Sequence, residues 1–421
     1  MYVMLDVFIF QIWLFVILLA IEQVLAILSN EERDIVVTYY YGQGYTYKEI
    51  CGFLLFSHNT IVSLRMLKRI VKRLRLRRRN VPCSLPDILR ALSELYERGF
   101  GECGYRTVWR LIKSSTNVHV TQDIIRRLLK ICDPEGVNLR ARHRLRRRTY
   151  INPGPNYTIH LDGYDKLKPF GICIHGAIDG YSRKLLWLEA CYSNNNPEII
   201  AGYYLNAVKR IGRVPRRVRG DAGTENVVVR DIQVALRYEH TDNMAAANSF
   251  LTGTSPANQR IEQFWGTLRV SFTVFWRNHF KDMADMGKLN INDRIHLEVL
   301  RFCFMPMIQR DLDTFTKVWN QHRIRRQRHS EVPNGIPEVL YHQPEVMDTS
   351  DQSLPLPCSV EFLTRIEMEY AKPKPKFGCT DEFLPILEQV CGLPRDQIPR
   401  PKTVDLATDL FCALIEIIDL M

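Results

Sequence analysis

Apolar side chains recur with a helical period in the front part of the chain. From residue 31 to residue 79, apolar positions return every three or four residues, which predicts a helix, a turn and a second helix. Asn59 is the expected N-cap of the second helix. The stripe of that helix expected to face a core consists of Ile61, Leu64, Leu67, Ile70, Val71 and Leu74.

A second helical unit is predicted from residue 85 to residue 132. Its first helix ends at Gly99, and its last helix begins after Thr121, a favourable N-cap residue. The side chains expected to be buried are Ile88, Leu89, Leu92, Leu95, Val108, Leu111, Ile112, Ile125, Leu128, Leu129 and Cys132. Three helices of this kind are typical of a helix-turn-helix scaffold, whose last helix can enter the major groove of DNA.

The period changes to that of β-strands near residue 157. Strands are predicted at 157–162, 171–179 and 184–190, then a helix at 197–212 and a short strand that leads into Asp221. In the first strand Ile159 and Leu161 share one face, and His160 and Asp162 share the other. Asp162 is therefore expected to project from the end of a strand that is apolar on its opposite face.

Another helix is predicted to start at Ser255 as its N-cap, with Pro256 at its first position. Glu262 then lies in the second turn, beside a core stripe formed by Ile261, Trp265, Leu268 and Phe272. Strands alternating with helices predict an α/β fold for this part of the chain, with a mixed sheet flanked by helices. The front part is predicted to be all-α.

Positive charge is concentrated in the helical front part. The whole chain of 421 residues has a formal net charge of +11, whereas residues 31–156 hold 25 Lys and Arg against 11 Asp and Glu. Nine of the fifteen residues from 65 to 79 are basic and none is acidic. Phosphate is the natural counter-charge, so a polyanion-binding module is predicted. The alternatives are a basic face that only aids solubility, or a nuclear import signal.

The expected phosphate-contacting side chains lie on the two predicted units. They are Arg65, Lys68, Arg69, Lys72 and Arg73 in the first, and Arg126 and Arg127 in the second. Arg140–Arg148 is a linker with six Arg and no acidic residue, which also suits contact with a nucleic-acid backbone.

The cysteines and the first 28 residues favour different cellular locations for the protein. The eleven Cys form no Cys-x-x-Cys pair, which favours reduced thiols in an intracellular protein and gives no zinc-site pattern. Residues 7–28, in contrast, are almost entirely apolar and long enough to span a membrane. Three interpretations of this leader stay open: a membrane or targeting segment, a buried helix, or a translated upstream stretch that is not part of the working protein.

Asp162, Asp221 and Glu262 each lie at the edge of a predicted element and are followed by small or turn residues. Carboxylates that converge repel one another, and a divalent cation relieves that repulsion. Mg²⁺ prefers oxygen ligands, and a pair of such ions can activate the attacking oxygen and stabilise the leaving oxygen of a phosphoryl transfer. The chain holds 46 acidic residues, so their spacing alone does not single out this trio.

Five sequence blocks together resemble the catalytic core of the retroviral integrase and DDE transposase superfamily. They are HLDGYDK, AIDGYSRKLLWLE, RGDAGTEN, SPANQRIEQFWGTLR and WNQHRIRRQRHSEVPNGIPEVLY, in the order of that family. The resemblance implies an RNase H-like fold in which Asp162, Asp221 and Glu262 bind two Mg²⁺ or Mn²⁺ ions. With 40 residues between Asp221 and Glu262, the second gap is longer than is usual for integrases, which suggests an extra turn or loop.

The resemblance also bears on partners. The front part, and GECGYRTVW above all, resembles the helix-turn-helix units of bacterial insertion-sequence transposases. DNA, both transposon ends and target, is the implied partner, with Arg260 and Arg269 positioning a strand. A homo-oligomer and a nuclear location are expected, whereas a small-molecule cofactor and a membrane partner are not.

Other polar residues near the trio are expected to have structural or supporting roles rather than catalytic ones. Asp165 is expected to act in a turn, Asp179 as a strand residue that is not catalytic, and Glu225 as a residue that shapes its loop or lies on the substrate side. His160 is expected in the core. Asn258 is expected either to meet DNA or to be an exposed residue of the first helical turn.

The sequence thus divides into five expected segments. These are a leader at 1–30, a helix-turn-helix unit at 31–80, a second such unit with a basic linker at 81–150, the catalytic core at 151–345 and a tail at 346–421 whose last apolar helix either binds a partner or packs. The expected function is a polynucleotidyl transferase that cuts and joins DNA. Two alternatives remain: a domesticated, inactive DNA-binding protein, and a membrane-tethered nuclease.

Overall fold

The computed structural model describes residues 28–77, 84–116, 118, 120–141, 152–253, 258–325 and 333–420. Most of the predicted leader, residues 1–27, lies outside the described residues. Internal contacts divide the chain into two compact units, Met1–Val81 and Pro82–Met421. Within the described ranges, no helix combines the length and the apolar character needed to cross a membrane.

The first unit contains helices α2 (Asn30–Gln43), α3 (Tyr47–His58) and α4 (Leu64–Arg73), which pack against one another. Ser29 and Thr46 begin α2 and α3 with complete capping boxes. The prediction for Asn59 is wrong: this residue ends α3 in the left-handed conformation that Asn tolerates, and Ser63 is the N-cap of α4. The second predicted helix therefore begins later than its apolar pattern indicated.

The late start of α4 changes which side chains it buries. Leu67, Ile70 and Val71 are buried as predicted, whereas Ile61 is 85% exposed and Leu64 is 41% exposed. Ile61 precedes the helix, so it does not continue the apolar stripe. The predicted basic residues Arg65, Lys68, Arg69 and Lys72 are exposed. Arg73 is exposed as well, and it forms an ion pair with Asp34 of α2.

The second unit begins with helices α5 (Leu85–Glu97), α6 (Tyr105–Ser115), α7 (Gln122–Cys132) and α8 (Pro134–Ala141). Thr121 caps α7 as predicted. Leu89 and Cys132 are exposed, contrary to prediction, because they lie at the edge of the stripe that packs. Arg126 and Arg127 are exposed and both pair with Asp123.

These front helices are continuous with the rest of the second unit. Helix α6 packs on the long helix α13 (Arg294–Gln321), and Arg98 donates to the buried Asp311 of α13 at 2.9 Å. Gly99 has φ +84 and lies against Phe275, so a Cβ there would overlap the ring.

A mixed five-stranded sheet forms the centre of this unit, with the order β3-β2-β1-β5-β6. Its strands are β1 (Ile159–Tyr164), β2 (Cys173–Asp179), β3 (Leu185–Cys191), β5 (Val218–Gly220) and β6 (Phe250–Thr252). Strands β1, β2 and β3 are antiparallel neighbours, whereas β5 runs parallel to β1 and β6. Strand β6 lies where the sequence predicted only a turn or loop. A separate pair joins β4 (Arg213–Val214) to β7 (Leu354–Pro355).

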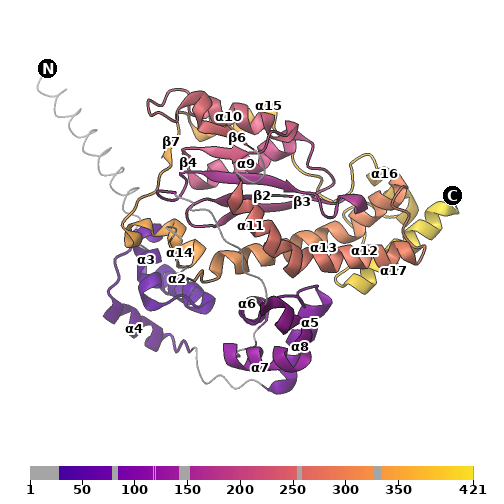
Figure 1. The fold of residues 1–421 in the computed structure, drawn as a ribbon, viewed down its shortest axis with the longest axis horizontal. Coiled ribbons are helices and arrows are strands. Elements are labelled where there is room, and N and C mark those ends of the chain that lie inside the picture. Colours follow the sequence, from indigo (N-terminus) through magenta and orange to yellow (C-terminus); the bar gives the residue numbers. More distant parts are fainter. Residues whose placement is uncertain are drawn as a thin grey trace, which may run out of the picture. The chain divides into compact units, whose positions relative to one another are not determined.

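Helices cover both faces of the sheet (Figure 1). Helices α9 (Pro197–Ile211), α10 (Val227–Leu236) and α15 (Val360–Tyr370) pack on one face, and α11 (Gln259–Leu268) and α13 pack on the other. Each face has its own apolar core, so β1 sends Ile159 and Leu161 to the α9 side and Tyr164 to the α13 side. His160 and Asp162 consequently face α11, as the alternation predicted.

The remaining elements complete the α13 side. A π-helical segment (Arg269–Thr273) links α11 to α12 (Val274–Asp285), and α14 (Pro337–His342), α16 (Leu384–Cys391) and α17 (Val404–Asp419) follow. Short 3₁₀ turns lie at Lys168–Phe170, Thr224–Asn226, Ala246–Ser249 and Pro344–Met347. Helix α17 buries Phe411 and Leu414 against α13, whereas Leu406 and Ile417 of the same helix are exposed.

Candidate active site

The predicted acidic trio comes from three neighbouring elements of the second unit. Asp162 lies on β1, Asp221 follows β5 directly, and Glu262 lies in the first turn of α11. Strand β1 continues to Tyr164, so Asp162 is inside the strand rather than at its end, contrary to prediction. The helix begins at Gln259 with Asn258 as N-cap, so Glu262 is not in the second turn. The predicted cap residues Ser255 and Pro256 lie outside the described residues.

The three carboxylates interact electrostatically. The pKa of Asp162 is raised to about 7, mainly by burial and also by the charges of Glu262 and Asp221, against the opposing effect of a hydrogen bond from Trp265. Burial and the charge of Asp221 also raise the pKa of Glu262, while Lys166 lowers it. The three acids therefore share one electrostatic neighbourhood, and bringing them together costs free energy that a cation can offset.

Two contacts hold α11 against β1, one on each side of Glu262. The buried Asn258 donates from Nδ2 to the Leu161 carbonyl at 2.9 Å, and its Oδ1 lies 2.6 Å from His160 Nδ1. Burial lowers the pKa of His160 to about 3, so the ring is neutral and Nδ1–H donates to the amide oxygen. Trp265 donates from Nε1 to Asp162 Oδ2 at 2.9 Å.

The sequence did not predict that Asn258 has a structural role, as a buried residue that joins α11 to β1. It is 2% exposed, so both expectations, an exposed helix residue and a DNA contact, are wrong. The signal that points to it is His160, because a polar side chain on the inward face of a buried strand requires a buried partner. His160 itself is 1% exposed, in line with its expected core position.

The loop after β5 organises Asp221. Asp221 Oδ1 accepts from Asn226 Nδ2 at 2.8 Å and from the Gly223 amide at 3.2 Å. Burial and a hydrogen bond with Asp221 raise the pKa of Glu225, so the two carboxyls lie against each other. Glu225 thus contacts a member of the trio directly, from the loop that it was expected either to shape or to present to a substrate.

Asp165 and Asp179 have protein partners of their own. Asp165 accepts from Lys168 Nζ at 2.9 Å and from Asn194 Nδ2 at 3.0 Å. The fully buried Asp179 accepts from the Asn156 amide and from the amide and hydroxyl of Ser182, each at 2.7 Å. These contacts give both residues roles in holding turns.

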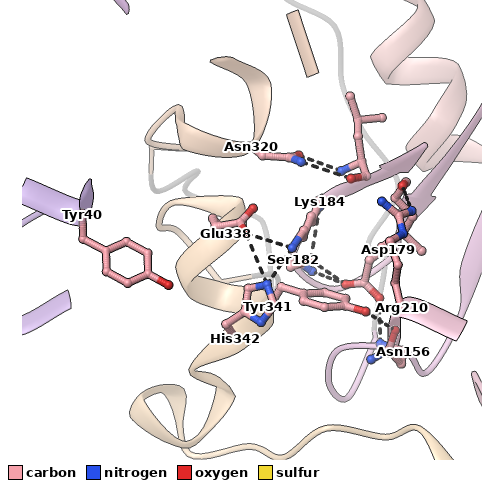
Figure 2. A network of polar contacts seen from close by, with 12 residues as sticks. Tyr40, Asn156, Asp179, Ser182, Lys184, Arg210, Asn320, Glu338, Tyr341 and His342 are labelled. Carbon is pink, nitrogen blue, oxygen red and sulfur yellow. Dashed lines mark hydrogen bonds and ion pairs between the residues drawn. The ribbon is translucent and has the colours of Figure 1, made fainter. Parts of the chain in front are cut away.

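Figure 2 shows that Asp179 belongs to a polar network between the β2–β3 turn and α14. Lys184 of the turn donates to Glu338 of α14 at 2.9 Å, and Tyr341 donates to Asn156 Oδ1 at 2.8 Å (Figure 2). The ammonium of Lys184 and the hydrogen bond from His342 outweigh burial, and the pKa of Glu338 is lowered to about 2. The network fixes α14 to the edge of the sheet.

The part of the chain that carries this sheet and the trio matches a known family. Residues 149–352 match the model described as the integrase core domain. The match supports an integrase and DDE transposase superfamily member. The predicted RNase H-like fold, a mixed sheet flanked by helices after an all-helical front, is confirmed. No curated protein matches the chain.

Integrase core domains belong to a polynucleotidyl transferase-like family that acts on DNA and generally uses divalent metal ions. In this core, the carboxylate oxygens of the trio are suitable ligands for such a hard ion, because a bound cation would offset both the burial of Asp162 and the charges of Glu262 and Asp221, which together raise the pKa of Asp162. Among the described residues, however, no three His, Cys, Asp or Glu side chains are gathered closely enough to hold a metal ion. The donor chemistry therefore fits, and the ligands would have to draw together on binding.

The two arginines predicted to position DNA differ in the integrase core. Arg260 donates from Nε to the Gly180 carbonyl at 3.1 Å and is half-buried, so it also connects α11 to the β2–β3 turn. Arg269 is exposed at the start of the π-helical segment, and such segments often occur at functional sites.

Proposed function

We propose that this protein is a DDE-type polynucleotidyl transferase that cuts and joins DNA, with Asp162, Asp221 and Glu262 as its metal-binding triad. The observation that carries the proposal is the electrostatic coupling of these carboxylates, which come from β1, the end of β5 and α11. Two Mg²⁺ or Mn²⁺ ions are the proposed cofactors. When bound, such ions activate an attacking oxygen and stabilise the leaving oxygen of a phosphodiester.

Hydrogen bonds from neighbouring residues orient the three carboxylates for that chemistry. Trp265 holds one oxygen of Asp162 through its indole N–H and so fixes the direction of the carboxylate. Asn258 fixes the start of α11, so Glu262 is presented from a rigid turn. The Asn226 amide group orients Asp221 in the same way. These neutral donors direct the carboxylates without adding a competing positive charge.

Replacing Asp221 with Asn tests the proposal, and Asp231→Asn is a matched control because Asp231 is exposed on α10. We expect D221N to lose Mg²⁺-dependent nicking and joining of a DNA oligonucleotide, with DNA affinity unchanged or higher because a negative charge is removed. D231N should behave as the wild type. Equal nicking by D221N and D231N would refute the proposed mechanism.

A second candidate function is a domesticated DNA-binding protein whose core has no catalytic role. The observation that favours it is that the described acidic side chains are not gathered into a ready-made metal site. Titration calorimetry with Mn²⁺ separates the two candidates. Binding that is lost in D221N supports the enzyme, and DNA binding without any Mn²⁺ signal supports the inactive protein.

For the front units we propose DNA recognition, with α3 and α4 as a helix-turn-helix and the exposed cations of α4 on the DNA backbone. A homo-oligomer is proposed because two DNA ends have to be joined, and sedimentation with and without DNA tests this. A nuclear location is proposed from the basic run at 65–79, and imaging of a tagged full chain tests it.

A further inference from the structure

Helix α17 carries a second apolar stripe besides the one that faces its own core. This outer stripe of α17 returns at intervals of four, three, four and three residues and consists of Leu406, Leu410, Ala413, Ile417 and Leu420. Leu406 is 55% exposed and Leu420 is 83% exposed, whereas Leu410 is partly buried. Spacing of this kind lets two helices pack along a shared apolar seam.

One flank of the outer stripe of α17 is acidic. Asp405, Asp409, Glu416 and Asp419 each come one position before a stripe residue. One position is about 100° around a helix, so all four acids lie on the same side of the stripe. They are exposed, none forms an ion pair within the described part of the chain, and α17 itself contains no Lys or Arg. A helix that packs on this stripe should therefore bring cations to that side.

Helix α7 also carries an outer apolar stripe. The outer stripe of α7 consists of Ile124, Leu128 and Ile131, at intervals of four and three residues. Ile124 is 40% exposed and Ile131 is 76% exposed. In its own chain α7 packs on α6 and α8, and α17 packs on α13 and α16. The exposed members of both outer stripes are thus not covered by the described part of their own chain.

The corresponding flank of α7 is basic. Arg127 and Lys130 each come one position before a stripe residue, on the same side as the acids of α17. Asp123 precedes Ile124 in the same way, but it pairs with both Arg126 and Arg127. Three cations and one acid give α7 a net charge of +2, and four acids give α17 a net charge of −4. The two surfaces match in apolar spacing and are opposite in charge.

We propose that α7 of one copy of this chain packs antiparallel on α17 of a second copy. When two helices face each other antiparallel, the flanks formed by the residues before each stripe position lie side by side. Arg127 and Lys130 then face the acids of α17, while the apolar side chains fill the seam between the helices. Burial of the seam drives association, and the charges select the partner and its direction.

Two α17 helices fit each other less well than α17 fits α7. Antiparallel pairing of α17 with α17 would set one acidic flank against the other, and parallel pairing would give the acids no cation. A single pair of short helices buries less area than a stable complex usually does, so association should be weak and depend on concentration. Two copies that exchange both helices would make the contact twice, as twofold symmetry allows.

Sedimentation velocity of the full chain over a range of concentrations, without DNA or metal ions, tests this contact. The α17 reversal is Asp409→Lys with Glu416→Lys, and the α7 reversal is Arg127→Glu with Lys130→Glu. Each should weaken association by about tenfold, because attraction becomes repulsion. One chain that carries both reversals has the signs exchanged, so it should associate to within about threefold of the wild type.

Glu361→Lys with Glu369→Lys is the matched control, because both acids are exposed on α15 and the change in charge equals that of the α17 reversal. The control should associate as the wild type does. Urea unfolding followed by circular dichroism checks that the variants are folded. If a reversal unfolds earlier than the wild type, Leu406→Gln and Ile131→Gln replace it, and each should weaken association by about tenfold through lost apolar burial.

Three results would overturn the proposal. The first is a wild type that stays monomeric at every concentration, and the second is association that neither reversal weakens. In the third, each reversal weakens association but their combination does not restore it, which would mean that α17 binds a different basic helix. The proposal extends the proposed homo-oligomer without depending on catalysis. D221N should associate as the wild type does, so absent nicking with intact association would count against the proposed function alone.

Discussion

Replacing Asn258 with Ala would remove the contact that ties α11 to β1. Asn258 satisfies two buried groups at once, the Leu161 carbonyl and the Nδ1–H of a neutral His160. A buried polar group left without its partner costs about 1–3 kcal/mol. Two groups are left in this way, and any water that enters recovers part of the cost, so the expected loss in the free energy of unfolding is about 2–4 kcal/mol.

Tryptophan fluorescence during urea unfolding measures this loss of stability in the second compact unit, which contains Asn258. Five of the six tryptophans, Trp109, Trp187, Trp265, Trp276 and Trp319, belong to the second unit. Because Trp13 lies in the first unit, the measurement uses a Trp13→Phe background, in which the signal comes from the second unit. Asn195→Ala is the matched control, because Asn195 is exposed, and it should change stability by less than about 0.5 kcal/mol. The nicking rate of N258A should also fall by about tenfold to a hundredfold, because Glu262 loses its fixed position.

Asn258→Asp refines the test. The carboxylate can still accept from His160 but cannot donate to the Leu161 carbonyl, so stability should lie between that of the wild type and that of N258A. The added charge should raise the pKa of His160, which NMR titration of the imidazole can follow. If N258A matches N195A in both stability and nicking rate, Asn258 does not position α11 and the argument is refuted.

Three further results are expected from the same structure. Trp265→Phe keeps the stacking on Tyr164 but removes the hydrogen bond to Asp162. Because that bond lowers the pKa of Asp162, the pKa should rise above about 7 in the variant. Nicking near neutral pH should therefore be slower, which a pH–rate profile can show. Glu338, whose folded pKa of about 2 lies below its ordinary 4.5, should contribute about 2–3 kcal/mol of stability above pH 4.5 that is lost as the pH falls toward 2. The difference in unfolding free energy between wild type and Glu338→Gln should therefore shrink on acidification, and a constant difference would contradict the assignment. In the first unit, Leu67→Ala should lower the free energy of unfolding by about 2–4 kcal/mol, because Leu67 is fully buried. Unfolding followed by circular dichroism measures this loss. The same change at the half-exposed Leu64 should lower the free energy of unfolding much less.

The parts of the fold that the sequence predicted well are those governed by period and local caps. Strand β1 alternates as predicted because both faces of the sheet are covered, and a shift of one residue would send Ile159 and Leu161 to the wrong core. Thr121 was recognised as a cap because its hydroxyl bonds an amide three residues ahead, within the same short segment. Local chemistry of this kind is visible in a single stretch of sequence.

The errors occurred where a residue had two local uses or where long-range contacts decide. Asn59 is suited to beginning a helix and equally to ending one, and only the position of Ser63 determines that α4 starts later. Strand β6 is three residues long and has too few positions to show a period; it is a strand because β5 supplies its hydrogen-bond partners.

Asn258 shows why the site could be predicted only in part. Residue type and the resemblance to integrases selected Asp162, Asp221 and Glu262, because carboxylates at element edges have a recognisable chemistry. The group that fixes their relative positions is a neutral amide, bonded to residues almost a hundred positions earlier in the chain. Its hydrogen-bonding capacity is satisfied only in the folded state, so neither composition nor spacing distinguishes it from an exposed Asn. The ligands of an active site are therefore easier to recognise in a sequence than the neutral residues that hold them in place.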